Sequence, residues 1–132
     1  MHAEAAFPAE LASAPAARRY AAAQLRDWSC EPLVDSAELL ISELVVNAVL
    51  HAESAVTLRL TLRPDALRVE IADASREPPR PRPIDPTAVT GRGLLIVDAV
   101  ATTWGVDPTS QGKVVWFELA ADDGDPAPVT AR

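Results

Sequence analysis

Three polar side chains, Glu43, Asn47 and His51, recur every four residues in a stretch that is otherwise almost wholly apolar, residues 38–52. Because an α-helix turns once in about 3.6 residues, this spacing places all three in one stripe on one helix face. A carboxylate and a carboxamide are costly on a buried helix face unless another polar group meets them. The stripe is therefore either a hydrogen-bonded seam between helices or one wall of a polar site.

As the wall of a site, this stripe offers specific chemistry. The amide oxygen of Asn47 is a suitable hard ligand for Mg²⁺. Glu43, one helical turn away, could orient or deprotonate an attacking hydroxyl or water. His51 is more often a packing or capping residue than a catalyst, and no second histidine is placed to share a metal with it. The chain also has no Ser-His-Asp order, no Walker-type glycine loop and no zinc-ligand spacing.

Two downstream features favour the site over the seam. Asp73 ends an apolar, strand-like segment, where its carboxylate could accept from an exocyclic amine or simply cap a turn. Gly91-Arg92-Gly93 precedes Leu94 at the start of an apolar helical segment. Free backbone N–H groups and the helix dipole at such a start suit a phosphate, although a glycine pair is more often just a turn.

A proline-rich segment separates these two features, with five prolines between residues 77 and 90. Such a segment forms neither a helix nor a central strand, so we expect a long loop, which in a compact domain is usually functional or disordered. The arginines in or beside the loop could neutralise a polyphosphate, or be solvated surface charges. They are Arg76, Arg80, Arg82 and Arg92.

Capping signals and hydrophobic periodicity predict the helices and strands that carry these residues. Ser13 and Pro15 predict a helix start, with the helix running to about Trp28, and Asp35 with Glu38 predicts a second helix reaching Ala52. Alternating apolar and polar residues predict an antiparallel hairpin that ends at Asp73. The two strands of this hairpin are predicted at 56–62 and 67–73. A helix is predicted over 94–101, followed by closing strands at 103–106 and 113–119.

This order of elements predicts an α+β fold, a two-layer sandwich in which helices pack on one face of a mixed sheet. We expect one domain over residues 13–120. An Ala-rich flexible arm would precede it at 1–12, and a disordered acidic tail would follow at 121–132.

Composition restricts the partners. A net charge of −7 argues against generic binding to nucleic acid or to an anionic membrane. No apolar run reaches the roughly 18 residues of a membrane span, and no signal-peptide order is present, so we expect a cytoplasmic protein. The single cysteine, Cys30, excludes an internal disulfide and a multi-cysteine metal site.

Taken together and in this order, the motifs resemble the Bergerat-type ATP-binding fold of the GHKL superfamily, shared by gyrase, Hsp90, histidine kinases and MutL. The specific similarity is to bacterial anti-sigma-factor serine/threonine kinases, of the small stand-alone type common in actinobacteria. It covers roughly residues 13–120. The matching segments are 42–52, 69–73, 91–97 and 112–119.

The resemblance implies roles for individual residues. Asn47 would coordinate a Mg²⁺ ion that bridges the ATP phosphates, and Glu43 would act as general base on the substrate serine. Asp73 would read the adenine amino group, and the segment 77–90 would be the ATP lid. Gly91 and Gly93 would shape the lid and the phosphate-binding helix start. The predicted nucleotide-binding set also includes His51, Ser75, Arg76, Arg92 and Leu94.

One departure from the family pattern bears on activity. The second motif usually continues Asp-x-Gly-x-Gly, whereas this chain has Ser75 in place of the first glycine, no second glycine, and Pro78 where the lid should hinge. Adenine could still be held by Asp73 together with the Ser75 hydroxyl. The substitutions nevertheless raise the alternative of a weaker or altered nucleotide site.

The sequence therefore leaves two candidate functions. The first is an ATP- and Mg²⁺-dependent serine/threonine kinase that phosphorylates an antagonist protein and sequesters a sigma factor, in an arrangement that permits a homodimer through the first helix. The alternative is a non-catalytic nucleotide-sensing or protein-binding module. A histidine-kinase catalytic domain is disfavoured, because we find neither the dimerisation helix pair nor a placed phospho-acceptor histidine.

Overall fold

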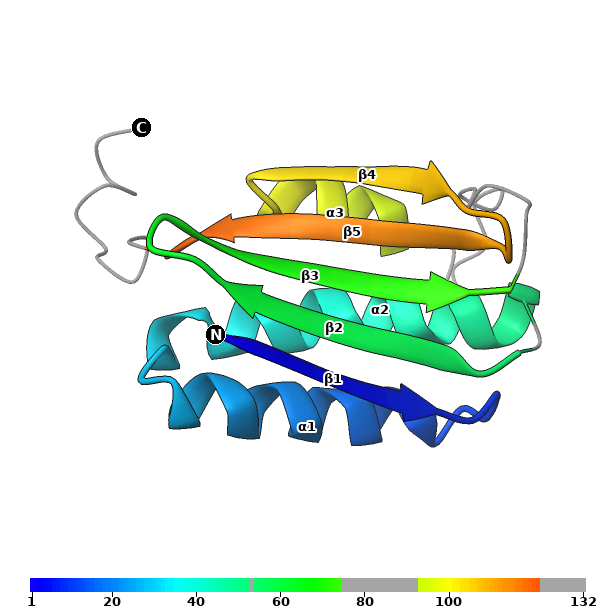
Figure 1. Cartoon of the computed structure of the whole chain (residues 1–132), viewed down its shortest axis with the longest axis horizontal. Helices are drawn as coiled ribbons and strands as arrows, with labels where there is room; N and C mark the ends of the chain where they lie inside the picture. Colours follow the sequence, from blue (N-terminus) through cyan, green and yellow to red (C-terminus); the bar gives the residue numbers. More distant parts are fainter. Residues whose placement is uncertain (53, 75–92, 122–132) are drawn as a thin grey trace.

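The computed structural model describes residues 1–52, 54–74 and 93–121 of the chain. Five strands form one sheet in the order β1-β2-β3-β5-β4, and helices cover one face of it (Figure 1). The elements are β1 (His2–Phe7), α1 (Ser13–Asp27), the 3₁₀ turn η1 (Glu31–Leu33), α2 (Val34–Ala52), β2 (Val56–Leu62), β3 (Ala66–Asp73), α3 (Gly93–Val100), β4 (Thr103–Pro108) and β5 (Lys113–Ala120).

The predicted α+β sandwich with helices on one face is confirmed, but the sheet is not mixed. All four strand pairings among the described residues are antiparallel. The chain does return through α3 so that β4 runs parallel to β3, as in a crossover unit. However, β5 lies between these two strands and pairs with both, so no parallel pair forms.

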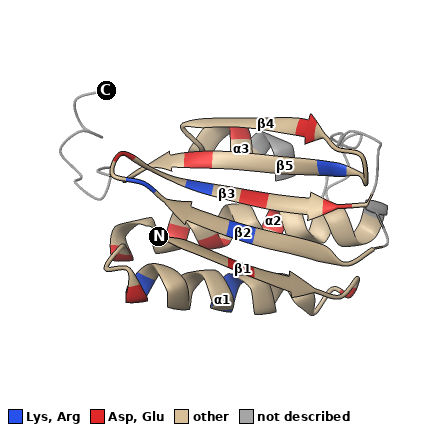
Figure 2. Ribbon diagram, in the orientation of Figure 1, with Lys and Arg blue, Asp and Glu red and all other residues tan. Residues whose placement is uncertain are grey.

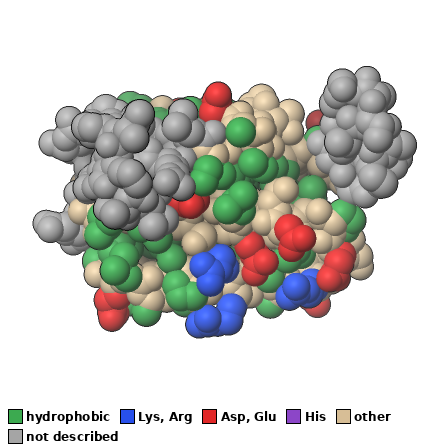
Figure 3. All heavy atoms as spheres, turned by 180° about the vertical axis from the view of Figure 1, so that it is seen from behind, with side chains coloured by type: hydrophobic (Ala, Val, Ile, Leu, Met, Phe, Trp, Pro, Cys, Tyr) green, Lys and Arg blue, Asp and Glu red, His purple; other side chains and the backbone are tan. Residues whose placement is uncertain are grey.

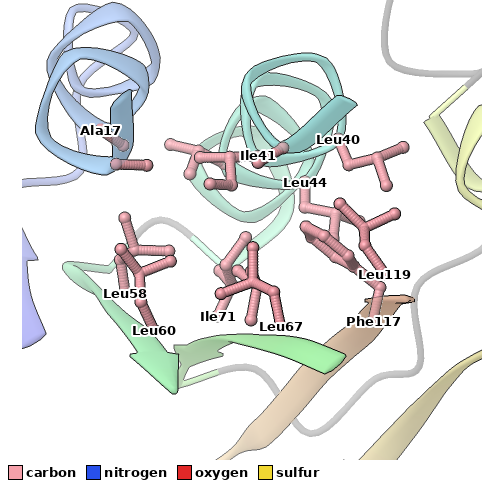
Figure 4. Packing of buried hydrophobic residues seen from close by; sticks show 14 of the residues in the cluster. Ala17, Leu40, Ile41, Leu44, Leu58, Leu60, Leu67, Ile71, Phe117 and Leu119 are labelled. Carbon is pink, nitrogen blue, oxygen red and sulfur yellow. The ribbon is translucent and has the colours of Figure 1, made fainter. Parts of the chain in front are cut away.

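The core lies between the inner face of the sheet and the helices. Because side chains alternate along a strand, every second residue of β2, β3 and β5 points toward the helices and is buried, except Leu62 at the end of β2, which is half-buried. Helix α2 packs over the centre of the sheet and against both α1 and α3. Figure 4 shows the facing residues Leu40, Ile41 and Leu44 of α2, Ala17 of α1, Leu58 and Leu60 of β2, Leu67 and Ile71 of β3, and Phe117 and Leu119 of β5.

The N-terminal segment differs from the sequence prediction, because residues 2–7 of the expected flexible arm form the edge strand β1. This strand pairs with β2 from His2 opposite Thr61 to Phe7 opposite Val56. The ring of Phe7 packs edge-on against Tyr20 of α1, with centroids 6.1 Å apart. Alanine favours strands only weakly, so the composition of this segment concealed its alternation. The acidic tail was predicted over residues 121–132, and all of it except Ala121 lies outside the described residues.

Helix α1 begins at the predicted residue but with a different cap. Ala12 occupies the N-cap position, and no side chain caps the helix. The hydroxyl of Ser13 instead donates to the carbonyl oxygen of Pro8 at 2.6 Å. Ser13 therefore ties the end of the β1 segment to α1 rather than satisfying the first helical turn.

The outer face of the sheet is covered by a charge network. It crosses four strands through the contacts Glu4–Arg59, Arg59–Glu70, Glu70–Arg68, Arg68–Glu118 and Glu118–Arg63, with N–O distances from 2.7 to 3.3 Å. Figure 2 shows these charges alternating across β1, β2, β3 and β5. We call these six residues the outer-face network.

The surface on the helix side is of mixed character. Figure 3, the molecule from behind, shows acidic, basic and hydrophobic side chains interspersed over the described surface. None of the described helices is long and apolar enough to cross a membrane.

Candidate ATP site

Helix α2 carries the predicted polar stripe in its carboxyl-terminal half. Asn47 is buried, with 8% of its surface exposed, and Glu43 one turn earlier is half-buried. Neighbouring apolar residues of α2, including Leu44 and Val45, anchor this part of the helix in the core. His51 lies in the last turn of α2, and its side chain is outside the described part of the structure. The arrangement thus holds an amide and a carboxylate on one face of a firmly packed helix.

Asp73, the last residue of β3, points to the inner face of the sheet. It continues the buried alternation of Val69 and Ile71, so its carboxylate enters the layer that holds the helices. There it meets Lys113, the first residue of β5, which lies directly opposite in the strand register. The ammonium nitrogen of Lys113 is 3.0 Å from each carboxylate oxygen, and the two side chains are only 6% and 2% exposed, respectively.

Gly112 brings β5 against the backbone of Asp73. A Cβ atom at this position would lie 2.0 Å from the carbonyl oxygen of Asp73 and 2.7 Å from the Cα atom of Ala74. No side chain fits there without moving the end of β3. Gly112 and Lys113 therefore hold Asp73 from two sides, one through its backbone and the other through its carboxylate.

A further hydrogen bond fixes the chain just after Asp73. The backbone N–H of Ala74 donates to the hydroxyl of Ser54 at 3.1 Å. Ser54 lies between the end of α2 and the start of β2, so the exits from α2 and from β3 are joined. The N–H of Ala74 is thus satisfied by a side chain at the point where the strand pairing ends.

The structure brings most of the described site residues to one end of the sandwich. Figure 1 shows the carboxyl end of α2, the carboxyl end of β3, the start of β5 and the start of α3 at the same end of the sheet. Gly93 is the first residue of α3 and Leu94 the second; α3 packs against α2. Ser75, Arg76, Gly91, Arg92 and the predicted lid 77–90 lie outside the described residues.

The donors fit a magnesium–nucleotide better than a bare metal ion. The described residues contain no group of three His, Cys, Asp or Glu side chains that could hold a metal ion. Mg²⁺ bound with a nucleotide typically takes one or two protein ligands and completes its shell with phosphate oxygens and waters. A single buried amide such as that of Asn47 suits this second mode. Cys30 is buried in the core, and burial raises the pKa of its thiol, which disfavours the thiolate that binds metals.

Sequence reasoning missed Lys113 as a site residue, although the sequence contained a signal. Lys113 is the only lysine of the 132 residues. It also lies in phase with Val115, Phe117 and Leu119, the inward residues of the predicted closing strand. A lysine in a buried phase requires a paired acid. Asp73 ends another predicted strand in its own inward phase, which makes it an acid of the matching kind.

Comparison with known families identifies the domain family of this fold. The family model described as the histidine kinase-like ATPase domain matches residues 7–119, nearly all of the described fold. A comparison with curated proteins finds no match. The matched span begins at the end of β1 and ends in β5, so it includes the helix bearing Glu43 and Asn47 and both strands that form the Asp73–Lys113 pair. The chain belongs to the histidine kinase-like ATPase family of the GHKL superfamily and is an ATP-binding regulatory protein.

Proposed function

We propose that this protein is a serine/threonine kinase that uses Mg-ATP to phosphorylate an antagonist protein and that sequesters a sigma factor. ATP binding follows from the family. The kinase activity rests on one observation, the half-buried carboxylate of Glu43 one helical turn from the buried amide of Asn47. In this proposal Glu43 is the proton acceptor and Asn47 the ligand of the phosphate-bound metal, on one helix.

Each polar residue of the site has a distinct proposed role. Asn47 holds the magnesium ion through its amide oxygen, and Asp73 accepts from the exocyclic amine of adenine. Mg-ATP, when bound, supplies the phosphoryl group and the metal charge that offsets negative charge on it. Glu43 orients the serine hydroxyl and accepts its proton. Positioned general bases contribute roughly 10²- to 10⁴-fold to a rate.

The partner proteins come from the sequence resemblance. The resemblance to anti-sigma kinases supports a sigma factor and its antagonist as the proteins bound, and a homodimer as the assembly. Tyr20 and Trp28, the aromatic residues of the first helical segment, are half-buried and pack against the core. They leave part of their surface available to a second protein.

The test is phosphate transfer from labelled ATP to a partner captured on the immobilised protein and then purified. Glu43→Gln keeps the size of the side chain and removes the base, so we expect transfer to fall by at least about 100-fold with ATP affinity retained. Glu38→Gln, at an acid of the same helix more than one turn away, is the matched control and should transfer normally. Equal transfer by wild type and Glu43→Gln would show that Glu43 is not the base.

A second candidate function is a nucleotide sensor without catalysis. The sequence after Asp73 favours it, because Ser75 and Pro78 replace residues that give the family's lid its freedom. Calorimetric titration with Mg-ATP separates the candidates. Saturable binding without transfer to any partner would support the sensor, and no binding at millimolar nucleotide would contradict both. With Asn47→Ala we expect the magnesium-dependent part of the affinity to disappear; unchanged affinity would contradict coordination there.

A further inference from the structure

Because Asp73 is paired with Lys113, a nucleobase in this site would contact a carboxylate that already binds an ammonium group. The carboxylate is compensated by an ammonium group at 3.0 Å from both of its oxygens, and both side chains are almost fully buried. Burying a charge costs free energy unless the charge is paired, so each side chain offsets the desolvation cost of the other in this layer. Neither the resemblance nor the family match assigns a role to Lys113.

We infer that Lys113 is a positioning residue for recognition of an amine-bearing purine base, acting through Asp73. The inference rests on the proposed ATP site and deepens it. A carboxylate has about four acceptor positions, and an ammonium group bridging both oxygens uses one on each. The bridge fixes the rotation of the carboxylate while remaining compatible with an amine donor at another position.

The backbone contacts make this positioning rigid. Gly112 allows β5 to lie against the carbonyl of Asp73, and the hydroxyl of Ser54 receives the next backbone N–H, that of Ala74. The main chain on both sides of the carboxylate is therefore held. Lys113 itself extends from a strand that pairs with β3 on one side and β4 on the other. A donor held on such a strand is positioned more accurately than one on a loop.

A purely structural ion pair would be indifferent to the base, and this difference can be measured on the unmodified protein. Because Lys113 is the only lysine, ¹³C-lysine labelling gives a single side-chain εCH₂ signal. We expect this NMR signal to shift on titration with Mg-ATP and to stay in place with magnesium triphosphate, which lacks the base.

The alternative outcomes are distinguishable. ATP binding by calorimetry with an unmoved lysine signal, or equal shifts with ATP and triphosphate, would overturn the role of Lys113 and leave the proposed function intact. Absence of ATP binding would overturn the proposed function and this inference with it.

A variant gives a second, independent readout. Purine riboside triphosphate lacks only the amine of ATP, and we expect the wild-type protein to prefer ATP over it by about tenfold, the worth of one charge-assisted hydrogen bond. Lys113→Met should reduce this preference to about one, whereas Arg63→Met, which removes a cation at the outer-face network, should keep it. An unchanged preference in folded Lys113→Met would overturn the inference. If that variant does not fold, the lysine signal of the wild-type protein decides.

Discussion

The two faces of the sheet both carry oppositely charged pairs across β3 and β5, but in opposite environments. On the inner face Lys113 and Asp73 form a pair whose side chains are at most 6% exposed. On the outer face Arg68 joins Glu70 and Glu118, with side chains 23 to 25% exposed, within the larger outer-face network. A basic and an acidic residue thus face each other twice along the same two strands, Arg68 opposite Glu118 near one end and Asp73 opposite Lys113 at the other.

Burial, rather than the number of contacts, determines how much each pair contributes to the free energy of unfolding. Exposed ion pairs contribute about 0 to 1 kcal/mol, because water screens them and their side chains lose entropy. Removing one partner of a buried pair leaves an uncompensated charge and costs about 3 to 5 kcal/mol. The outer-face network is a distributed surface feature, whereas the inner pair is a single point at which the site can be broken.

The largest expected effect is therefore on the inner face. We predict that Lys113→Met lowers the free energy of unfolding by about 3 to 5 kcal/mol, since Asp73 stays buried without its cation. Urea denaturation followed by circular dichroism measures the change. Asp73→Asn combined with Lys113→Met should recover much of the loss, because no charge is then left unpaired.

Arg59→Met is the matched control on the outer face. Arg59 contacts Glu4 and Glu70 but is 39% exposed, so the expected loss is about 0 to 1 kcal/mol. Comparable losses in the Arg59 and Lys113 variants would contradict the argument that burial separates the two faces.

Two glycines, Gly112 just before β5 and Gly105 within β4, give the next largest effect. We predict that Gly112→Ala costs about 1 to 3 kcal/mol, because its Cβ would meet the backbone of Asp73 and Ala74, which cannot move independently. Gly105→Ala places its Cβ 2.7 Å from the ring of Trp116 instead. That ring lies on the half-exposed outer face and can shift, so the loss should be smaller. Thermal unfolding of both variants tests the order, and a larger loss at Gly105 would reverse the comparison.

The sequence predicted much of the fold because its hydrophobic periodicity is strong. The helix that carries Glu43 and Asn47 was expected to end at Ala52 and does so, and the strand ending at Asp73 was predicted to its last residue. Hydrophobic periodicity does not reveal a strand whose inward and outward side chains differ little in hydrophobicity. The segment 2–7 alternates in burial, but three of its six residues are alanine. Its pairing with β2 becomes visible only through contacts such as Glu4 with Arg59.

The part of the site that depends on local spacing was predictable from the sequence, and the part that depends on strand order was not. Local spacing placed Glu43 and Asn47 on one helix face, because helical periodicity acts within a few residues. The partner of Asp73 is 40 residues away in the chain, and its identity depends on the order of strands in the sheet. With β5 inserted between β3 and β4, Lys113 lies opposite Asp73; a β3–β4 pairing would have placed another residue there. Strand order is a tertiary property that local patterns do not encode.

A smaller effect is expected from the centre of the outer-face network. Arg68 contacts Glu70 and Glu118 and lies 4.3 Å from the ring centroid of Trp116. We predict that Arg68→Met lowers the free energy of unfolding by about 1 kcal/mol, from the lost ion pairs and the cation–π contact, because the methionine stem still covers the indole. Arg63→Met, which removes one contact to Glu118 at a 46% exposed position, should cost less. A loss for Arg68 equal to that of Lys113→Met would show that the network acts as a buried unit.

The smallest effect is a pH dependence at Glu70. Burial alone would raise the pKa of this carboxyl, but hydrogen bonds from Arg68 and Arg59 outweigh it and hold the pKa below its ordinary value of 4.5. Because the folded protein binds the proton less tightly than the unfolded chain, the stabilisation is present above pH 4.5 and is lost as the pH falls through the lowered pKa. We therefore predict that wild type is more stable than Glu70→Gln by less than about 1 kcal/mol near neutral pH, and that the difference shrinks in acid. Urea titrations between about pH 7 and pH 3 measure it, with Glu10→Gln controlling for the loss of one exposed negative charge. A difference that stays constant over this range would mean that the arginines on the outer face contribute packing rather than charge.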